Sequence, residues 1–205
     1  MDKKPVPDIV VSRLPLYLRA LQLMAQEGMQ VTSSQELGNR LGISAAQIRK
    51  DLSQFGEFGK QGTGYSIEYL IRKLQEILKV DRVWDMVVVG AGDIGSAVAR
   101  YQGFTNRGFR VTMIFDNDPA KIGNQVGSFI IQDSANLIEK IREAGIQVAM
   151  IAVPASEAQK VADQLIQAGV KAILNYAPVP INVPPDVHLQ HFDPAIHLQH
   201  MTYYL

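Results

Sequence analysis

Apolar residues recur at helical spacing in the first part of the chain. Between residues 12 and 26 they fall three or four positions apart, which is typical of a helix with one buried side. Ser12 has the position of a cap, and Pro15 lies in the first turn, where its missing N–H costs little. We therefore predict a helix over 12–26 whose apolar stripe consists of Leu14, Tyr17, Leu18, Leu21, Met24 and Ala25.

A second, shorter helix is predicted to begin after Ser33. Ser33 and Glu36 have the spacing of a capping box, in which the serine oxygen accepts a backbone N–H of the first turn. The pattern extends to about Leu41. Gly42 then supplies the turn, because glycine readily adopts the left-handed conformation that ends many helices.

A third helix is predicted from Ala45 to about Phe55, with Ser44 as its cap and with Ile48 and Leu52 facing inward. A short helix, a glycine turn and a second helix form a helix-turn-helix, whose second helix places its N-terminal half in a major groove. We expect base contacts from Gln47 and Arg49 and phosphate contacts from Lys50 and Ser53, with Ser44 in the same candidate set.

A glycine-rich segment follows this helix pair. Glycines surround Lys60 between Phe58 and the β-favouring Tyr65 and Ile67, which predicts a tight hairpin, the wing of a winged helix. Lys60 near its tip and Tyr65 are further candidate DNA contacts. A last helix, Ile67 to Leu78, closes a DNA-binding domain over 1–80. The alternative is a helical packing module with ordinary surface charges.

From residue 85 the pattern changes to buried strands that alternate with helices. The run DMVVVG leads directly into GAGDIG, and a helix follows. In this context G-x-G-x-x-G predicts a dinucleotide-binding turn. Gly90 permits the tight turn, Gly92 the approach of the pyrophosphate, and Gly95 close packing of helix on strand. The candidate binding residues here are Gly90, Ala91, Gly92, Asp93, Ile94 and Gly95.

The second strand, residues 110–116, ends in Asp116. A carboxylate at this position accepts hydrogen bonds from the adenosine ribose and repels a 2′-phosphate. Asn117 and Asp118 add no cation, so we expect NAD(H) to be preferred over its phosphorylated relative. The alternative is an ordinary turn with incidental glycines.

Strands and helices continue to alternate, with helices at 133–144 and 155–168 and strands at 147–153 and 171–176. This order predicts an α/β, doubly wound, Rossmann-like parallel sheet, domain 81–190. Ligands bind at the carboxyl ends of such strands. The turns AVP and NYAP lie there, and their alternative role is to terminate the strands. The nicotinamide candidates are Val153, Pro154, Asn175, Tyr176, Ala177 and Pro178.

A terminal helix is predicted after Asp193, its cap, with Pro194 at the first helical position. Leu198, Met201 and Leu205 form a stripe that should not stay in water, so residues 191–205 should pack on their own chain or on a second copy. Helix-turn-helix proteins usually bind DNA as two-fold dimers.

Four histidines lie past the last predicted strand, in or before this helix: His188, His191, His197 and His200. A metal site there is conceivable, but surface or interface histidines are favoured.

Composition narrows the function classes. The chain has no cysteine, which excludes disulfides, thiolate metal sites and thiol switches, so redox sensing would need a bound cofactor. No apolar run reaches the roughly 20 residues of a membrane span, and a cytoplasmic location is expected. Net charge is zero, but residues 1–80 hold eleven Lys and Arg against eight Asp and Glu. A mildly basic first domain is compatible with a polyanionic partner.

Together, ISAAQIRKDLSQFGEFGKQGTGY, VGAGDIGSA, FDNDPAKIG, AVP and NYAP, in this order, resemble the Rex family of redox-sensing transcriptional repressors. The resemblance covers nearly the whole chain. It implies a homodimeric, NADH-sensing repressor of inverted-repeat operators, with a swapped terminal helix and with NADH and NAD⁺ as cofactors. On matching positions it implies pyrophosphate and ribose contacts from Gly90–Gly95 and Asp116, adenosine contacts from Asp118 and Lys121, and nicotinamide contacts from the AVP and NYAP turns.

The resemblance also suggests a polar relay. Arg19 lies on the polar side of the first helix, Tyr101 at the end of the helix after the glycine turn, and Asp193 at the terminal helix. Our hypothesis is that Arg19 pairs with an acceptor in one state, and that Tyr101 and Asp193 exchange partners when NADH binds.

Two other function classes compete with the repressor. One is a small NAD-dependent oxidoreductase with an accessory helical domain. The other is a DNA-binding protein whose Rossmann unit is only a dimerisation scaffold. A substrate domain and an acid–base group are not evident in the sequence, so we expect no enzyme activity.

Overall fold

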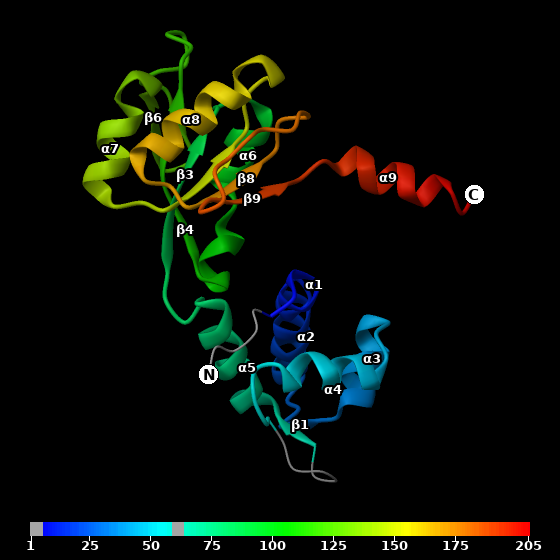
Figure 1. The fold of residues 1–205 in the computed structure, drawn as a ribbon. Helices are drawn as coiled ribbons and strands as arrows, with labels where there is room; N and C mark the ends of the chain where they lie inside the picture. Colours follow the sequence, from blue (N-terminus) through cyan, green and yellow to red (C-terminus); the bar gives the residue numbers. More distant parts are fainter. Residues whose placement is uncertain (1–5, 59–63) are drawn as a thin grey trace. The chain divides into compact units, whose positions relative to one another are not determined.

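The computed structural model describes residues 6–58 and 64–205 and divides the chain into two compact units, residues 1–82 and residues 83–205 (Figure 1). Lys60 lies outside the described residues. Within the described ranges, no helix is both long and apolar enough to cross a membrane.

The first unit is a small helical domain with a two-stranded sheet. Its helices are α1 (Asp8–Val11), α2 (Leu14–Gln26), α3 (Ser34–Leu41), α4 (Ala45–Ser53) and α5 (Ile67–Leu78), and its strands are β1 (Val31–Thr32) and β2 (Tyr65–Ser66). The core gathers fully buried apolar side chains from α2, α3, α4 and α5, among them Leu21, Leu37, Ile48, Leu52 and Leu74. The predicted helix-turn-helix and the helix from Ile67 to Leu78 are therefore confirmed.

The start of the first helix differs from the prediction. Residues 8–11 form the separate turn α1, and α2 begins only at Leu14. The Ser12 hydroxyl donates to the carbonyl oxygen of Ile9 at 3.1 Å, so Ser12 ends α1 and caps nothing. At the other end Ala25 is exposed, whereas Ala20, which the predicted stripe omitted, is buried.

Serine caps begin α3 and α4 as predicted. Ser33 Oγ accepts the backbone N–H of Glu36 at 3.1 Å, and Ser44 Oγ accepts that of Gln47 at 3.2 Å. Gly42 has a φ of 67° at the end of α3, which is the left-handed conformation that the turn requires. These caps satisfy N–H groups that would otherwise lack partners at the helix starts.

Most of the predicted hairpin, residues 59–63, lies outside the described residues, but the structure shows a strand pairing beside it that the sequence did not suggest. Tyr65 and Ser66 pair with Val31 and Thr32, which lie between α2 and α3, and Ile67 already belongs to α5. Phe58 packs against the helical core. The pairing needs glycine at position 64, where φ is 76° and a Cβ would lie 2.6 Å from the Thr32 carbonyl oxygen. A close backbone approach between distant segments therefore sets this sheet.

The second unit is built on a seven-stranded sheet in the order β5-β6-β4-β3-β7-β8-β9. All neighbouring strands run parallel except β5 and β6. The strands are β3 (Trp84–Val89), β4 (Phe109–Asp116), β5 (Gln125–Val126), β6 (Phe129–Asp133), β7 (Val148–Ile151), β8 (Ala172–Asn175) and β9 (His188–His191).

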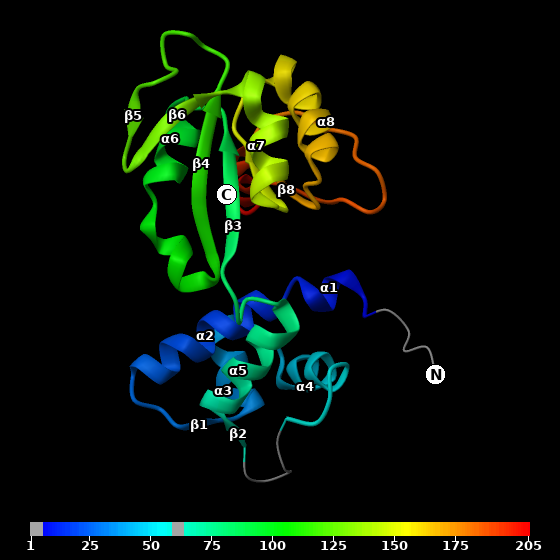
Figure 2. The same cartoon turned by 90° about the vertical axis from the view of Figure 1, so that its left-hand side faces the viewer.

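Helices cover both faces of this sheet (Figure 2). α6 (Asp93–Arg100) lies on one face, and α7 (Leu137–Ala144) and α8 (Ala158–Ala168) lie on the other. Strand β3 is therefore buried on both faces. Met86 and Val88 pack in the core on the α6 side, while Val87 and Val89 pack with α7 and α8. A strand buried on both faces reads as the continuous apolar run seen in the sequence, and the predicted doubly wound sheet is confirmed.

Three strands and two helix starts were missed or misplaced. β5, β6 and β9 were not predicted, and His188 and His191 lie within β9 rather than past the last strand. β9 is an edge strand with mostly exposed residues, so it lacks the apolar run that marks a buried one. Short 3₁₀ turns occupy 134–136 and 155–157, and α7 and α8 begin only after them.

The terminal helix α9 (Pro194–Thr202) begins as predicted, with Asp193 Oδ1 accepting the backbone N–H of Ala195 at 2.9 Å. Its apolar side chains are exposed to solvent: Ile196, Leu198 and Met201 are each about 60% exposed. This helix therefore presents an apolar surface that its own unit does not cover.

Candidate functional sites

The loop between β3 and α6 is shaped by its glycines. Gly90 has a φ of 100°, and a Cβ there would collide with the Ala152 carbonyl oxygen. A Cβ at Gly95 would collide with the Gly90 carbonyl oxygen, so helix and loop are in contact. Around Gly92 nothing lies within 4 Å of a built Cβ. Two glycines thus serve packing, and the third faces open space in front of the α6 N-terminus, where an anion is favoured.

That open space belongs to a cleft of about 730 Å³ at the carboxyl ends of β3, β4, β6 and β7. Of the predicted dinucleotide residues it is lined by Gly90, Gly92, Asp93, Ile94, Asp116, Asn117, Asp118, Lys121, Val153 and Pro154. Ala152 of the predicted AVP turn lines it as well, and so do residues that the sequence reasoning missed: Val89, Asp133, Ser134, Ala135, Glu157, Lys160, Val161 and Gln164. Asp133 would have been found had β6 been recognised, because it ends that strand.

Asp116 is the buried acceptor of the cleft. Its Oδ2 accepts the Ala91 N–H at 2.7 Å and the Lys121 ammonium at 3.2 Å, and its Oδ1 accepts the Asp118 N–H at 2.9 Å. Burial alone would raise the pKa of Asp116, but these hydrogen bonds and the Lys121 charge bring the pKa below its ordinary value. Three of about four lone-pair positions of the carboxylate are filled, so one is left for a ligand.

Lys121 supplies a cation beside Asp116, which Asn117 and Asp118 do not. Its ammonium contacts Asp116 and lies 4.0 Å from Asp118 Oδ2, and its side chain is 40% exposed at the cleft. Two carboxylates against one ammonium leave this end of the cleft negative. A negative end of the cleft would repel a 2′-phosphate, less strongly than Asp116 and Asp118 would without Lys121.

Six predicted binding residues do not line the cleft: Ala91, Gly95, Asn175, Tyr176, Ala177 and Pro178. Asn175 is fully buried and braces its own turn, since Nδ2 donates to the Val179 carbonyl at 2.9 Å and Oδ1 accepts the Ala177 N–H at 3.0 Å. The Tyr176 ring packs 5.0 Å from that of Phe192, and burial raises the pKa of its hydroxyl. The strand-terminating role of the NYAP turn is thus visible in the geometry.

In the first unit, α4 carries exposed cations and hydroxyls. Arg49 donates to Ser34 Oγ at 2.9 Å, and Ser53 donates to the Lys50 carbonyl at 2.8 Å, so each has a partner within its own unit. Both Arg49 and Lys50 are exposed. Tyr65 is half-buried and packs against the helical core.

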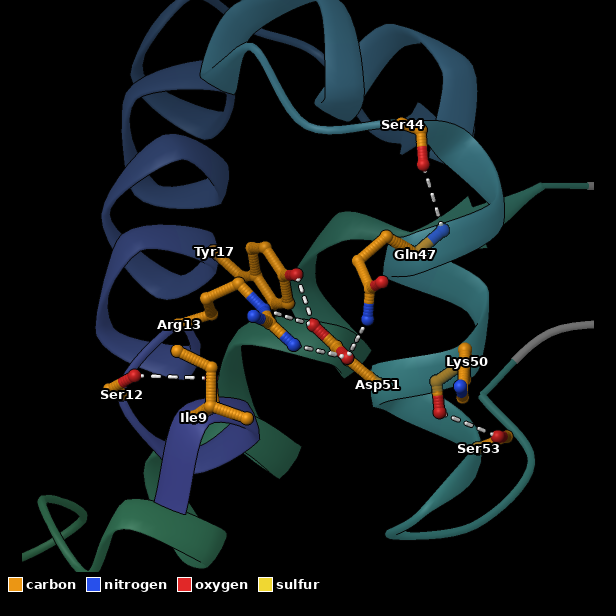
Figure 3. A network of polar contacts seen from close by, with 9 residues as sticks. All are labelled: Ile9, Ser12, Arg13, Tyr17, Ser44, Gln47, Lys50, Asp51 and Ser53. Atoms are coloured by element: carbon orange, nitrogen blue, oxygen red, sulfur yellow. Dashed lines mark hydrogen bonds and ion pairs between the residues drawn. The ribbon is translucent and has the colours of Figure 1, made fainter. Parts of the chain in front are cut away.

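A buried ionic cluster joins α4 to the start of α2 and was not singled out from the sequence (Figure 3). Asp51 is fully buried, and Arg13 donates to it from Nε at 2.6 Å and from Nη2 at 2.8 Å. The Tyr17 hydroxyl donates to Asp51 Oδ2 at 2.6 Å, and Gln47 Nε2 donates to Oδ1 at 2.7 Å. The only sequence signal was an aspartate three residues after Ile48, on the inward side of the helix.

The cluster shifts the titration of each member. Burial would raise the pKa of Asp51, but hydrogen bonds from Arg13, Tyr17 and Gln47 together with the Arg13 charge lower it. Burial raises the pKa of Tyr17 to about 12, with the Asp51 hydrogen bond acting in the same direction. The hydrogen bond to Asp51 raises the pKa of Arg13. Asp51 is therefore ionised and acts as an acceptor only.

The relay candidates lie at surface positions of their own units. Arg19 is exposed on α2, and Asp193 caps α9. Tyr101 ends α6, is 48% exposed, and packs edge-on 4.9 Å from the Phe104 ring. Among the residues that the structure describes, no three His, Asp or Glu side chains gather in a way that could hold a metal ion.

One chain thus combines a helix-turn-helix unit with a cleft of the dinucleotide-binding type, the composition of a ligand-regulated DNA-binding protein. Residues 5–53 match the family model "Putative DNA-binding protein N-terminus", and residues 81–179 match the model "CoA binding domain". The chain is 53% identical over 199 residues to the redox-sensing transcriptional repressor Rex of Chloroflexus aggregans, covering 97% of this chain and 94% of that one. It belongs to the Rex family of redox-sensing transcriptional repressors.

Other relatives agree. Rex 1 of Thermotoga maritima is 45% identical, over 97% of this chain and 95% of that one. The crystal structure of RSP with β-NAD⁺ and operator DNA matches with a TM-score of 0.93 at 36% identity, covering 98% of this chain and 93% of that one. RSP with β-NADH matches at 0.89 and 34%, covering 98% and 95%. The Chloroflexus and Thermotoga proteins are named as transcriptional repressors, and RSP as a Rex-family repressor, not as enzymes.

Proposed function

We propose that this protein is a transcriptional repressor that binds inverted-repeat operator DNA and leaves it when NADH binds, so that it senses the ratio of NADH to NAD⁺. The observation that carries the proposal is the presence, in one Rex-family chain, of α4 with its exposed cations and of the cleft before α6. The crystal structures of RSP with β-NAD⁺ and operator DNA and with β-NADH support both ligands.

In this proposal the N-terminus of α6, with Gly92 and Asp93, receives the pyrophosphate. Asp116 accepts a ribose hydroxyl with its remaining lone pair, and Asp118 and Lys121 flank the adenosine. The AVP turn, whose Val153 and Pro154 line the cleft, holds the nicotinamide. The NYAP turn, which follows the neighbouring strand β8 and does not line the cleft, is the second contact that the family resemblance implies. The opening at Gly92 and the unfilled acceptor position of Asp116 support this assignment.

On the DNA side, Ser44, Gln47, Arg49, Lys50, Ser53, Lys60 and Tyr65 form the contacts. The protein acts in the cytoplasm as a homodimer, and α9 is exchanged between the two copies. The bare apolar side of α9 supports this, because such a surface needs a partner. Arg19, Tyr101 and Asp193 form the relay that couples cofactor to DNA.

The two redox states differ by one positive charge on the nicotinamide ring. A neutral ring enters an apolar pocket at lower cost than a charged one, which favours NADH in the form that releases DNA. To convert the population from nearly all bound to nearly all free, NADH must prefer the released form by about 5.5 kcal/mol.

The test is fluorescence anisotropy of a labelled inverted-repeat duplex at fixed salt, titrated with NADH and separately with NAD⁺. We expect release by NADH and retention with NAD⁺. An Arg19→Ala variant should bind DNA but fail to release it with NADH. Retention at saturating NADH would leave the cofactor as a scaffold ligand, and turnover of a hydride donor would support the oxidoreductase instead.

A further inference from the structure

The buried Asp51 carboxylate has one more hydrogen-bond donor than it needs to compensate its charge. Arg13 supplies two donors, Tyr17 one and Gln47 one, so about four lone-pair positions of the carboxylate are all filled. Three of these donors come from the start of α2 and suffice to compensate the buried charge. The fourth comes from Gln47, one turn before Asp51 on the same helix. Gln47 is thereby held at a single orientation.

The chemistry of Asp51 decides which end of the Gln47 amide faces it. An ionised carboxylate only accepts hydrogen bonds, so the amide nitrogen must point to Asp51 and the amide oxygen away from it (Figure 3). The nitrogen keeps a second hydrogen. Gln47 is the third residue of α4 and is half-buried, in the N-terminal half of the helix that enters a major groove.

We propose that Asp51 is a positioning residue that fixes the Gln47 amide to read an adenine in the major groove. The inference rests on the proposed function, and it adds which base is read and what aims the reading side chain. In the groove, adenine presents an N6 donor beside an N7 acceptor, which matches one carbonyl oxygen and one remaining N–H. Guanine presents two acceptors, thymine one acceptor, and cytosine a donor alone.

Because the Gln47 amide is fixed before DNA binds, binding costs less side-chain conformational entropy. A free glutamine gives up rotamer entropy when it binds, while a glutamine already held by Asp51 has lost it on folding. Arg13 and Tyr17 have no need to reach DNA in this arrangement. They hold Asp51, and Asp51 holds Gln47.

The first experiment measures whether the contribution of Gln47 to binding depends on individual adenines of the DNA. A duplex is selected from a random pool with the full-length protein, and each of its adenines is replaced in turn by 7-deazaadenine, which lacks N7, or by purine, which lacks the 6-amino group. At one adenine of each half-site we expect binding to weaken by about 5-fold to about 150-fold for the unmodified protein. Gln47→Ala should show no further loss at that position and ordinary losses at the others.

The outcomes separate the inference from the function it rests on. If the pool yields no preferred duplex, the proposed function fails. If a duplex is selected but no adenine couples to Gln47, the proposed function stands and the inference is overturned.

The second experiment tests the positioning role of Asp51. In Asp51→Asn we expect the loss of discrimination between adenine and its analogues, while affinity for a random-sequence duplex, which depends on phosphate contacts, is retained. Arg40→Ala is the control, because it removes an exposed ion pair with Glu27 in the same unit and leaves the contacts of Asp51 and Gln47 in place, so discrimination should persist. Retained discrimination in Asp51→Asn would overturn the inference.

A measurement on the unsubstituted protein keeps the test open if Asp51→Asn does not fold. The NMR order parameter of the Gln47 side-chain amide in the free protein should lie near the rigid value of about 0.85, well above that of the exposed Gln54. A value below about 0.6 for Gln47 would show a mobile side chain and overturn the positioning role.

Discussion

Each unit buries one carboxylate among its described residues, Asp51 in the first and Asp116 in the second, and the two are used in different ways. Asp51 is saturated by side chains that reach it from α2 and from its own helix. Asp116 is held by two backbone N–H groups and by Lys121, and it keeps one acceptor position at the edge of a cleft. The number of lone pairs left unfilled, rather than burial, separates an organising carboxylate from one available to a ligand.

The two environments also differ in what happens when a partner is lost. A fully buried carboxylate without its cation is strongly destabilising, because no solvent replaces the missing donors. Asp116 lies beside open space, so water can replace Lys121 there. Changes around Asp51 should therefore be read in the stability of the first unit, and changes around Asp116 in ligand affinity.

The largest effect is expected for Arg13→Ala. It leaves Asp51 buried with its charge uncompensated, which should lower the free energy of unfolding of the first unit by about 3–5 kcal/mol. DNA binding should be lost with it, while NADH binding by the second unit persists. Urea unfolding of the full-length protein measures the change. Arg40→Ala, which breaks an exposed ion pair with Glu27, is the control and should leave the free energy of unfolding close to that of the unsubstituted protein.

A pair of glycine variants separates packing from binding in the second unit. Gly95→Ala forces a Cβ against the Gly90 carbonyl, next to the Ala91 N–H that Asp116 accepts, and should destabilise the unit by about 1–3 kcal/mol or more. Gly92→Ala meets no atom within 4 Å and should fold normally, yet bind NADH more weakly because its Cβ stands in the opening. Thermal unfolding and NADH titration of both variants measure the two effects. A loss of stability in Gly92→Ala would contradict the separation of packing from binding.

Asp116→Asn tests the unfilled acceptor position directly. A hydrogen bond that involves a charged group contributes about 1.5–3 kcal/mol, so NADH affinity should fall by about 10-fold to about 150-fold. Discrimination against NADPH should fall too, because one of the two negative charges beside Lys121 is gone. Asp85→Asn, at the opposite end of the sheet, is the control, and calorimetric titration should find its affinity unchanged.

The smallest expected effect is a fall in the free energy of unfolding at acidic pH. The pKa values of Asp51 and Asp116 are both lowered in the folded protein, so their contributions to stability are complete above the unfolded value of about 3.9 and are lost as the pH falls through the folded values. Unfolding free energies should therefore decline below about pH 4. Asp51→Asn should show a shallower decline for the first unit, and an unchanged slope would mean that Asp51 does not titrate in this range.

Local signals were the ones that the sequence carried well. Ser33, Ser44 and Asp193 cap their helices as predicted, since a cap depends on residues only two or three positions away. The glycine loop and Asp116 were found for a similar reason: a short motif between a buried strand and a helix has few other structures open to it. By contrast, Ser12 was misread because the chain before it forms a separate turn.

What the sequence could not supply were pairings between distant segments. Thr32 with Tyr65, β9 beside β8, and Arg13 with Asp51 all join residues whose proximity follows from the packed fold. The sequence by itself therefore determined the helix-turn-helix, the parallel sheet and the dinucleotide motif, because periodicity and capping act within one or two turns of chain. Only the tertiary structure decided which lone pairs are filled and which remain for a ligand, because a buried carboxylate takes its donors from whichever elements pack around it.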